Sequence, residues 1–168
     1  MDLKETLLSS YLAFDAQDGP QHKLQDQRAA AIEVFEQQGF PTKKEEDWKY
    51  TPLRNLIKTN YSVFPKEEVS LKLDEVKEYI LQDVDTYKIV FVDGIYNAYL
   101  SETTHVGVDV CLLSAALTKP KYADTIKKYF NQIAEKDASL TALNTAFTKE
   151  GAYIHVPEGK LVEKPVQI

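Results

Sequence analysis

Cysteine, glycine and long apolar runs are scarce in this sequence, and this scarcity excludes several classes of protein. Cys111 is the only cysteine among 168 residues, so the chain can form neither an internal disulfide nor a multi-cysteine metal site. No apolar run approaches the roughly 20 residues that cross a bilayer. The N-terminus carries Asp2, Lys4 and Glu5 and lacks the basic-then-apolar order of a signal peptide. We therefore expect a cytoplasmic protein with no membrane partner.

An excess of positive charge is also lacking. The chain has 20 basic and 26 acidic residues, which give a formal net charge of −6. Proteins that bind nucleic acids generally need a basic face to displace counterions from phosphates. The charge balance therefore predicts that nucleic acid is not a partner.

Motifs of common active sites are missing as well. The isolated glycines begin no phosphate-binding loop, and the three histidines lack the spacing of metal ligands. Cys111 and His105 could form a thiolate–imidazole pair in a small transferase, but we favour a buried structural cysteine because its neighbours are mostly apolar. His155, between Ile154 and Val156, is predicted to be structural or solvent-facing. We therefore expect no enzyme and no catalytic, cofactor-binding or metal site in the chain.

The first half of the sequence shows the start and stop signals of helices. Asp2 and Glu5 can form a capping box in front of an apolar stripe, which predicts a first helix. After a break at Asp18–Pro20, a second helix is predicted over Gln21–Gln38. It should end at Gly39 in a left-handed conformation, with the next aromatic ring folding back on its last turn.

Further short helices should complete a helical domain over residues 1–82. Thr42 and Glu45 form a second potential capping box. Thr51 and Pro52 resemble a cap followed by proline at the first helical position. A last short helix is predicted over Asp74–Gln82.

The second half of the sequence predicts a unit of mixed helices and strands over residues 83–151. Together with the helical first half, this pattern predicts an α+β fold for the whole chain. Asp93-Gly94 separates two apolar stretches, Tyr87–Val92 and Ile95–Leu100, as in a β-hairpin with a two-residue turn. Val106–Cys111 is predicted to be a strand. Ser114 is expected to cap the helix that follows.

Two later helices are predicted, the first of them from apolar residues that repeat at helical spacing. Ala123, Ile126, Phe130 and Ile133 should form the inner face of one helix, and Ser139–Phe147 should form another.

Short strands and turns dominate residues 152–168. Tyr153–Val156 and Pro165–Ile168 have strand patterns, and Pro157–Gly159 separates them as a turn. Ile168 on an unpaired strand would leave an apolar edge exposed. We therefore expect a truncated chain whose partner strands lie beyond it.

The segment Gly39–Leu53 is the most informative part of the sequence, and Phe40, Pro41, Trp48 and Tyr50 are its candidate functional residues. Two interpretations are open. The aromatic residues could anchor a small helical core, or they could form a partner-binding surface, since Trp and Tyr are enriched at interfaces. We favour the core, because few other large residues could hold these short helices together.

This segment also carries a resemblance. Arg28, Phe35, Gly39–Lys43 and the residues around Trp48-Lys49-Tyr50-Thr51 resemble the SufD signature RxxAxxxFxxxGFPTxKxExWKYT, with one extra residue before Trp48. Val92–Gly94 is similar to a hairpin of the SufB/SufD family. Residues 143–168 resemble the approach to its β-helix core.

The resemblance implies a scaffold subunit of the SufBCD complex, which builds iron–sulfur clusters. Such proteins carry an N-terminal helical domain, a right-handed parallel β-helix that pairs with SufB, and a C-terminal domain that docks the ATPase SufC. Val162–Ile168 would be an early rung, which cannot bury its face alone.

The partners SufB and SufC would then bind mostly outside this chain. The cluster is implied only for the full complex, and no residue here matches the functional cysteine and histidine of the later β-helix. The alternative is a free-standing protein-interaction module that uses Trp48 and Tyr50.

Overall fold

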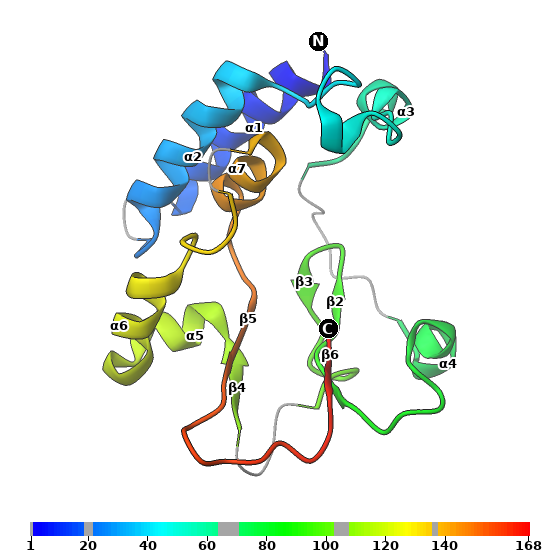
Figure 1. The fold of residues 1–168 in the computed structure, drawn as a ribbon, viewed down its shortest axis with the longest axis vertical. Coiled ribbons are helices and arrows are strands. Elements are labelled where there is room, and N and C mark those ends of the chain that lie inside the picture. The colour runs from blue at the N-terminus through cyan, green and yellow to red at the C-terminus, as the bar shows by residue number, and fades with distance from the viewer. Residues whose placement is uncertain (1, 19–21, 64–70, 103–107, 136–137) are drawn as a thin grey trace. The chain divides into compact units, whose positions relative to one another are not determined.

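The computed structural model describes residues 2–18, 22–63, 71–102, 108–135 and 138–168. It divides the chain into two compact units, each built from two separate stretches of sequence (Figure 1). The first comprises Met1–Phe64 and Asp124–Thr148, and the second comprises Pro65–Ala123 and Lys149–Ile168. The first unit is helical, and the described strands all lie in the second unit together with short helices, so the predicted α+β mixture is confirmed. The predicted boundaries after residues 82 and 151 stay a prediction.

Three helices make the core of the first unit. They are α1 (Leu3–Asp18), α2 (Gln25–Gln38) and α7 (Ser139–Ala146). Ala31 of α2 and Ala142 and Ala146 of α7 are buried in a shared cluster with Tyr11 and Phe14. Small side chains let the helix backbones approach closely, while the aromatic rings fill the remaining space. Figure 1 shows α7 lying beside α1 and α2, although α7 is far from them in sequence.

The capping box predicted for α1 is confirmed. The backbone N–H of Asp2 donates to Glu5 Oε2 at 3.2 Å, and the N–H of Glu5 donates to Asp2 Oδ1 at 2.8 Å. The start of α2 lies four residues later than predicted, because a turn precedes it. In that turn the N–H of Gln25 donates to the His22 carbonyl at 3.0 Å, and Leu24 is buried with 2% of its surface exposed. Most of the predicted break at Asp18–Pro20 lies outside the described residues.

Gly39 ends α2, as predicted, but its conformation differs from the expected one. Its φ of 67° is positive, yet its ψ of −158° lies far from the left-handed helical region. This combination is essentially restricted to glycine. The chain consequently leaves the helix in an extended direction, and Phe40 packs edge-on against Phe35 with ring centroids 5.3 Å apart. The predicted contact of Phe40 with the last turn is therefore confirmed.

Short elements follow in the first unit. A 3-10 turn, η2 (Glu46–Trp48), precedes α3 (Arg54–Lys58), which packs against α1. The prediction that Pro52 occupies the first helical position was wrong. The N-cap is Leu53, so α3 starts two residues after the proline.

The second unit contains three two-stranded sheets and short helices. Its strands are β1 (Tyr87–Lys88), β2 (Phe91–Val92), β3 (Ile95–Tyr96), β4 (Asp109–Leu112), β5 (Ala152–His155) and β6 (Val166–Gln167). Its helices are α4 (Leu73–Val76), followed by the 3-10 turn η3 (Lys77–Tyr79), and α5 (Leu113–Thr118). Helix α6 (Pro120–Tyr129) runs across the division between the units.

The predicted hairpin exists but is shorter than expected. β2 and β3 pair antiparallel, with Phe91 opposite Tyr96, and Asp93 and Gly94 have φ values of 50° and 78°. Two positive φ angles in a two-residue loop are the requirement of a type I′ turn. β1 does not extend this ladder. It pairs in parallel with β6, with Tyr87 opposite Val166.

The C-terminal strand thus has a partner within the chain, contrary to the prediction that it is unpaired. The N–H of Tyr87 donates to the carbonyl of Pro165, just before β6, and the N–H of Ile89 donates to the carbonyl of Gln167 in β6, both at 2.9 Å. Ile168 itself remains 71% exposed. β5 pairs antiparallel with β4, with Asp109 opposite His155. The parallel β-helix implied by the resemblance stays a prediction.

Two predictions about the later helices were wrong. Ser114 is not a cap, because Leu112 occupies that position and the Glu150 carboxylate accepts from the Ser114 N–H and hydroxyl at 3.0 and 2.5 Å. Ile133 is not an inner residue. Helix α6 ends before it, and Asn131, with φ of 56°, turns the chain, so Ile133 is 90% exposed. None of the helices in the described ranges is long and apolar enough to cross a membrane.

Candidate protein-interaction site

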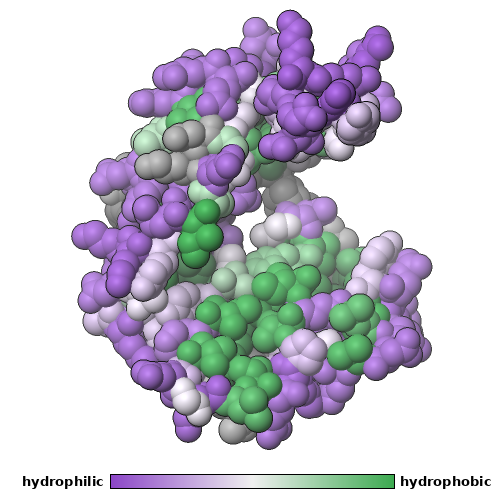
Figure 2. Space-filling model, viewed as in Figure 1, coloured by the Kyte–Doolittle hydropathy of each residue, from purple (hydrophilic) through white to green (hydrophobic). Residues whose placement is uncertain are grey.

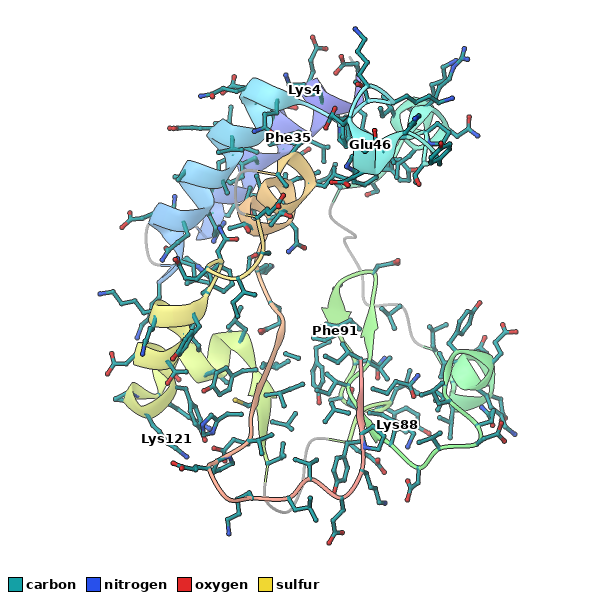
Figure 3. The ribbon with its side chains drawn as sticks, viewed as in Figure 1. Lys4, Phe35, Glu46, Lys88, Phe91 and Lys121 are labelled. Carbon is teal, nitrogen blue, oxygen red and sulfur yellow. The ribbon has the colours of Figure 1, made fainter. Side chains whose placement is uncertain are left out.

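The start of the Gly39–Leu53 segment is firmly anchored. Phe35, labelled on α2 in Figure 3, is completely buried and packs against the ring of Phe40. Pro41 is also buried. On the other side, the buried hydroxyl of Ser139, at the start of α7, donates to the Gly39 carbonyl. Phe40 and Pro41 therefore act as structural residues in this fold. The link from the end of α2 to the start of α7 is the hydrogen bond between the Gly39 carbonyl and Ser139.

The middle of the segment is ordered by local hydrogen bonds. The N–H of Thr42 donates to Glu45 Oε1 at 2.7 Å, which is one half of the predicted capping box. The other half differs, since the Thr42 hydroxyl accepts from the N–H of Lys44 at 3.3 Å. The N–H of Trp48 then donates to the Glu45 carbonyl at 3.1 Å. These bonds give a segment without a long helix a defined shape.

The end of the segment is presented to solvent. Tyr50 is 85% exposed, with Lys49 Nζ 5.5 Å from its ring centroid, and Trp48 is only half-buried. The prediction that Tyr50 anchors a core was therefore wrong. The single turn η2 buries none of its residues, so it provides no apolar face against which the tyrosine could pack. The four candidate residues thus divide into an anchored pair and a more exposed pair, Trp48 and Tyr50.

A second polar cluster lies on the β4–β5 sheet. Asp109 Oδ2 lies 3.0 Å from Lys121 Nζ and 3.2 Å from His155 Nδ1. The hydrogen bond with the Lys121 ammonium, followed by those with Tyr122 and His155, lowers the pKa of Asp109 to about 2. Sequence reasoning missed this cluster because its members are far apart in the chain. Only the register of β4 on β5 brings Asp109 opposite His155.

Comparison with known proteins identifies the family. Residues 12–168 match the model of the SufBD protein N-terminal region. The chain belongs to the SufB/SufD family. The resemblance inferred from the Gly39–Leu53 segment is confirmed.

Three relatives illustrate the extent of the similarity. An iron–sulfur cluster assembly SufBD family protein of Synechocystis is 21% identical over 145 residues, which are 86% of this chain and 32% of the relative. The iron–sulfur cluster assembly protein SufD of Escherichia coli is 39% identical over 66 residues, 39% of this chain and 15% of that protein. A SufBD family protein of Arabidopsis thaliana is 32% identical over 84 residues, 46% of this chain and 17% of that protein. The chain therefore spans a third or less of each relative's length.

Cys111 of this SufB/SufD family chain has the features of a structural thiol. It is half-buried on β4, opposite Tyr153. Burial raises the pKa of its thiol, the carboxylates of Asp109 and Glu150 act in the same direction, and Lys119 opposes them. A raised pKa reduces the thiolate fraction that nucleophilic chemistry needs. His105, the other member of the pair considered above, lies outside the described residues.

The described part of the chain, residues 2–18, 22–63, 71–102, 108–135 and 138–168, offers no cluster of metal ligands. In those ranges no group of three or more His, Cys, Asp or Glu side chains could hold a metal ion. His155 instead shares Asp109 with Lys121.

The Asp109 cluster predicts a specific loss of stability in acid. Because the pKa of Asp109 is about 2 in the fold and about 3.9 in an unfolded chain, its contribution is fully present above about pH 4. The contribution is lost as the pH falls through about 2. We expect the difference in unfolding free energy between the wild type and Asp109→Asn to shrink over this window. Urea unfolding at several pH values measures this difference.

A second variant makes this prediction more specific. Lys121→Met removes the largest cause of the lowered pKa, so the loss should move to higher pH. An Asp109→Asn difference that stays constant down to pH of about 2 would contradict the proposed ion pair.

Proposed function

We propose that this chain is the N-terminal region of a SufD-like subunit that helps assemble iron–sulfur clusters together with SufB-like and SufC-like proteins. The match of residues 12–168 to the SufBD N-terminal region carries the proposal. The names of the relatives support it, since all three refer to iron–sulfur cluster assembly. The SufD assignment within the family rests on the Gly39–Leu53 signature and on the identity with the Escherichia coli protein.

The role proposed for this region is that of a non-catalytic scaffold. Cys111, with its raised pKa, is a poor nucleophile, and the Asp109 carboxylate is engaged by Lys121 and His155. Instead, Phe40 packs on Phe35 and the Gly39 carbonyl accepts from Ser139, and both contacts stabilise the helical unit. The cluster is cargo of the assembled complex, and we assign none of its ligands to this chain.

The remaining parts of the proposal follow the family resemblance. A right-handed parallel β-helix would begin near β6 and would provide the contact with the SufB-like partner. A cytoplasmic location belongs to the same proposal, and fractionation of the source cells tests it.

Native purification tests the proposed complex. An affinity tag is placed at the N-terminus of the natural gene product, and the complex is isolated from the source cells under mild conditions. We expect an ATPase of the SufC type and a second SufB/SufD family subunit to co-purify in fixed ratio. Size-exclusion chromatography with mass spectrometry identifies both.

Purification without these subunits would support the alternative of a free-standing protein-interaction module. A tagged protein of about 19 kDa that purifies without either subunit would contradict the scaffold proposal. The free-standing interaction module would then be the better explanation.

A further inference from the structure

The surface that follows the anchored Phe40–Pro41 pair is locally basic in an acidic protein. Residues 43–58, named here the basic segment, contain five cations and three carboxylates, whereas the whole chain carries a net charge of −6. The five cations are exposed; they are Lys43, Lys44, Lys49, Arg54 and Lys58. Figure 2 shows a strongly hydrophilic surface in the region of α3.

These cations have no acidic partners in the part of the chain that the structure describes. None of the five forms an ion pair with a described residue. In the second unit, by contrast, Lys88, Lys121 and Lys164 lie 3.5, 3.0 and 2.5 Å from carboxylate oxygens of Glu102, Asp109 and Asp85. The basic segment therefore keeps its positive charge available for a partner.

An aromatic side chain lies among these cations. Tyr50 is 85% exposed and is flanked by Lys49, and Leu56 of α3 is 43% exposed. Tyrosine and arginine are enriched among residues that dominate binding energy, because they combine large contact area with directed polar groups. Exposed tyrosine beside unpaired cations suits a partner that carries both carboxylates and apolar side chains.

The shape of the segment is set before any partner binds. Thr42, Glu45 and Trp48 are joined by hydrogen bonds, and the N–H of Thr51 donates to the Trp48 carbonyl at 3.1 Å. Packing of Phe40 on Phe35 fixes the start of the segment. A surface ordered in advance loses less conformational entropy on binding.

From these observations we infer that the basic segment, with Tyr50 at its centre, binds an acidic segment of a partner protein. Carboxylates of the partner pair with Lys43, Lys44 and Arg54, and an apolar side chain packs on the Tyr50 ring. Nucleic acid is a poorer fit, because Glu46 and Asp47 are exposed among the cations and would repel a continuous row of phosphates. The inference does not depend on SufB-like or SufC-like partners.

Binding of simple acidic polymers by the purified 168-residue chain tests the charge contribution. The probes are fluorescein-labelled poly-L-glutamate and a glutamate–tyrosine copolymer, measured by fluorescence anisotropy at several salt concentrations. We expect the double reversal Lys43→Glu/Lys44→Glu to weaken binding by about tenfold or more, since two attractions become repulsions. Added salt should also weaken binding of the polymers by the wild-type chain.

A matched control keeps the result specific. Lys127 and Lys128 are also adjacent, exposed and without an ion pair among the described residues. The reversal Lys127→Glu/Lys128→Glu therefore changes the net charge equally and should leave affinity nearly unchanged. Circular dichroism and melting curves confirm that both variants fold.

The aromatic contribution has its own comparison. Tyr50→Ala should weaken binding of the copolymer several-fold, whereas Tyr99→Ala, which removes a tyrosine that is 82% exposed elsewhere, should not. The inference would be overturned if the wild type did not bind the polymers. It would also be overturned if the two charge-reversal variants lost equal affinity, or if the two tyrosine variants did. Equally tight binding of an oligothymidylate would overturn the choice of an acidic protein segment. None of these results bears on co-purification with the proposed complex.

Discussion

Replacing Phe35 by alanine is expected to lower the free energy of unfolding of the helical unit by about 3–5 kcal/mol. Phe35 has no exposed surface, and its ring packs edge-on against Phe40 at 5.3 Å. Its removal would leave a cavity beneath the Gly39–Leu53 segment, which neighbouring helices can fill only in part. Urea denaturation followed by circular dichroism measures the loss.

A second aromatic residue gives the control for this prediction. Tyr50→Ala removes a ring that is 85% exposed. The free energy of unfolding of this variant should therefore differ from that of the wild type by only about 0.5 kcal/mol or less. Phe35→Leu, which keeps most of the volume, should cost less than Phe35→Ala. Similar losses for Phe35→Ala and Tyr50→Ala would contradict the division of this region into an anchored and a presented part.

Replacing Gly39 by alanine is expected to destabilise the fold by about 1–3 kcal/mol. The cause is the backbone, since φ of 67° with ψ of −158° is strained for any residue with a Cβ. Steric contact is a smaller factor, because the nearest atom to an added Cβ would be the Lys4 stem at 3.5 Å. Thermal unfolding and urea denaturation of the variant measure the effect.

Gly151→Ala is the matched control for Gly39→Ala. Gly151 lacks a positive φ, and an added Cβ would meet the Leu113 side chain at an ordinary contact distance of 3.8 Å. We expect its stability to remain close to that of the wild type. Equal stability of the two alanine variants would contradict the view that the glycine-only conformation of residue 39 shapes the end of α2.

Features that depend on neighbours in the sequence were largely predictable. The Asp2–Glu5 capping box, the end of α2 at Gly39 and the Asp93-Gly94 turn are confirmed. Each involves residues within a few positions of one another, so their geometry follows from local backbone preferences. The family, too, was recognisable from the local Gly39–Leu53 signature.

Features that join distant segments were not predictable in the same way. β1 pairs with β6 rather than extending the hairpin, and Glu150 rather than Ser114 provides the capping oxygen for α5. The sequence offers many strands and carboxylates of suitable chemistry. Which of them meet depends on loop closure and strand register, which local propensity does not encode.

The sequence by itself determined the first capping box, the Asp93-Gly94 turn, the absence of an internal disulfide and the family of this protein. Only the tertiary structure decided that Phe40 and Pro41 are anchored while Tyr50 is exposed, because burial depends on which helices pack over a residue. The Asp109–Lys121–His155 cluster was likewise decided by the pairing of β4 with β5. The sequence specifies which side chains are present. Their surroundings, which decide the role of each side chain, are formed by segments that are far apart in the sequence.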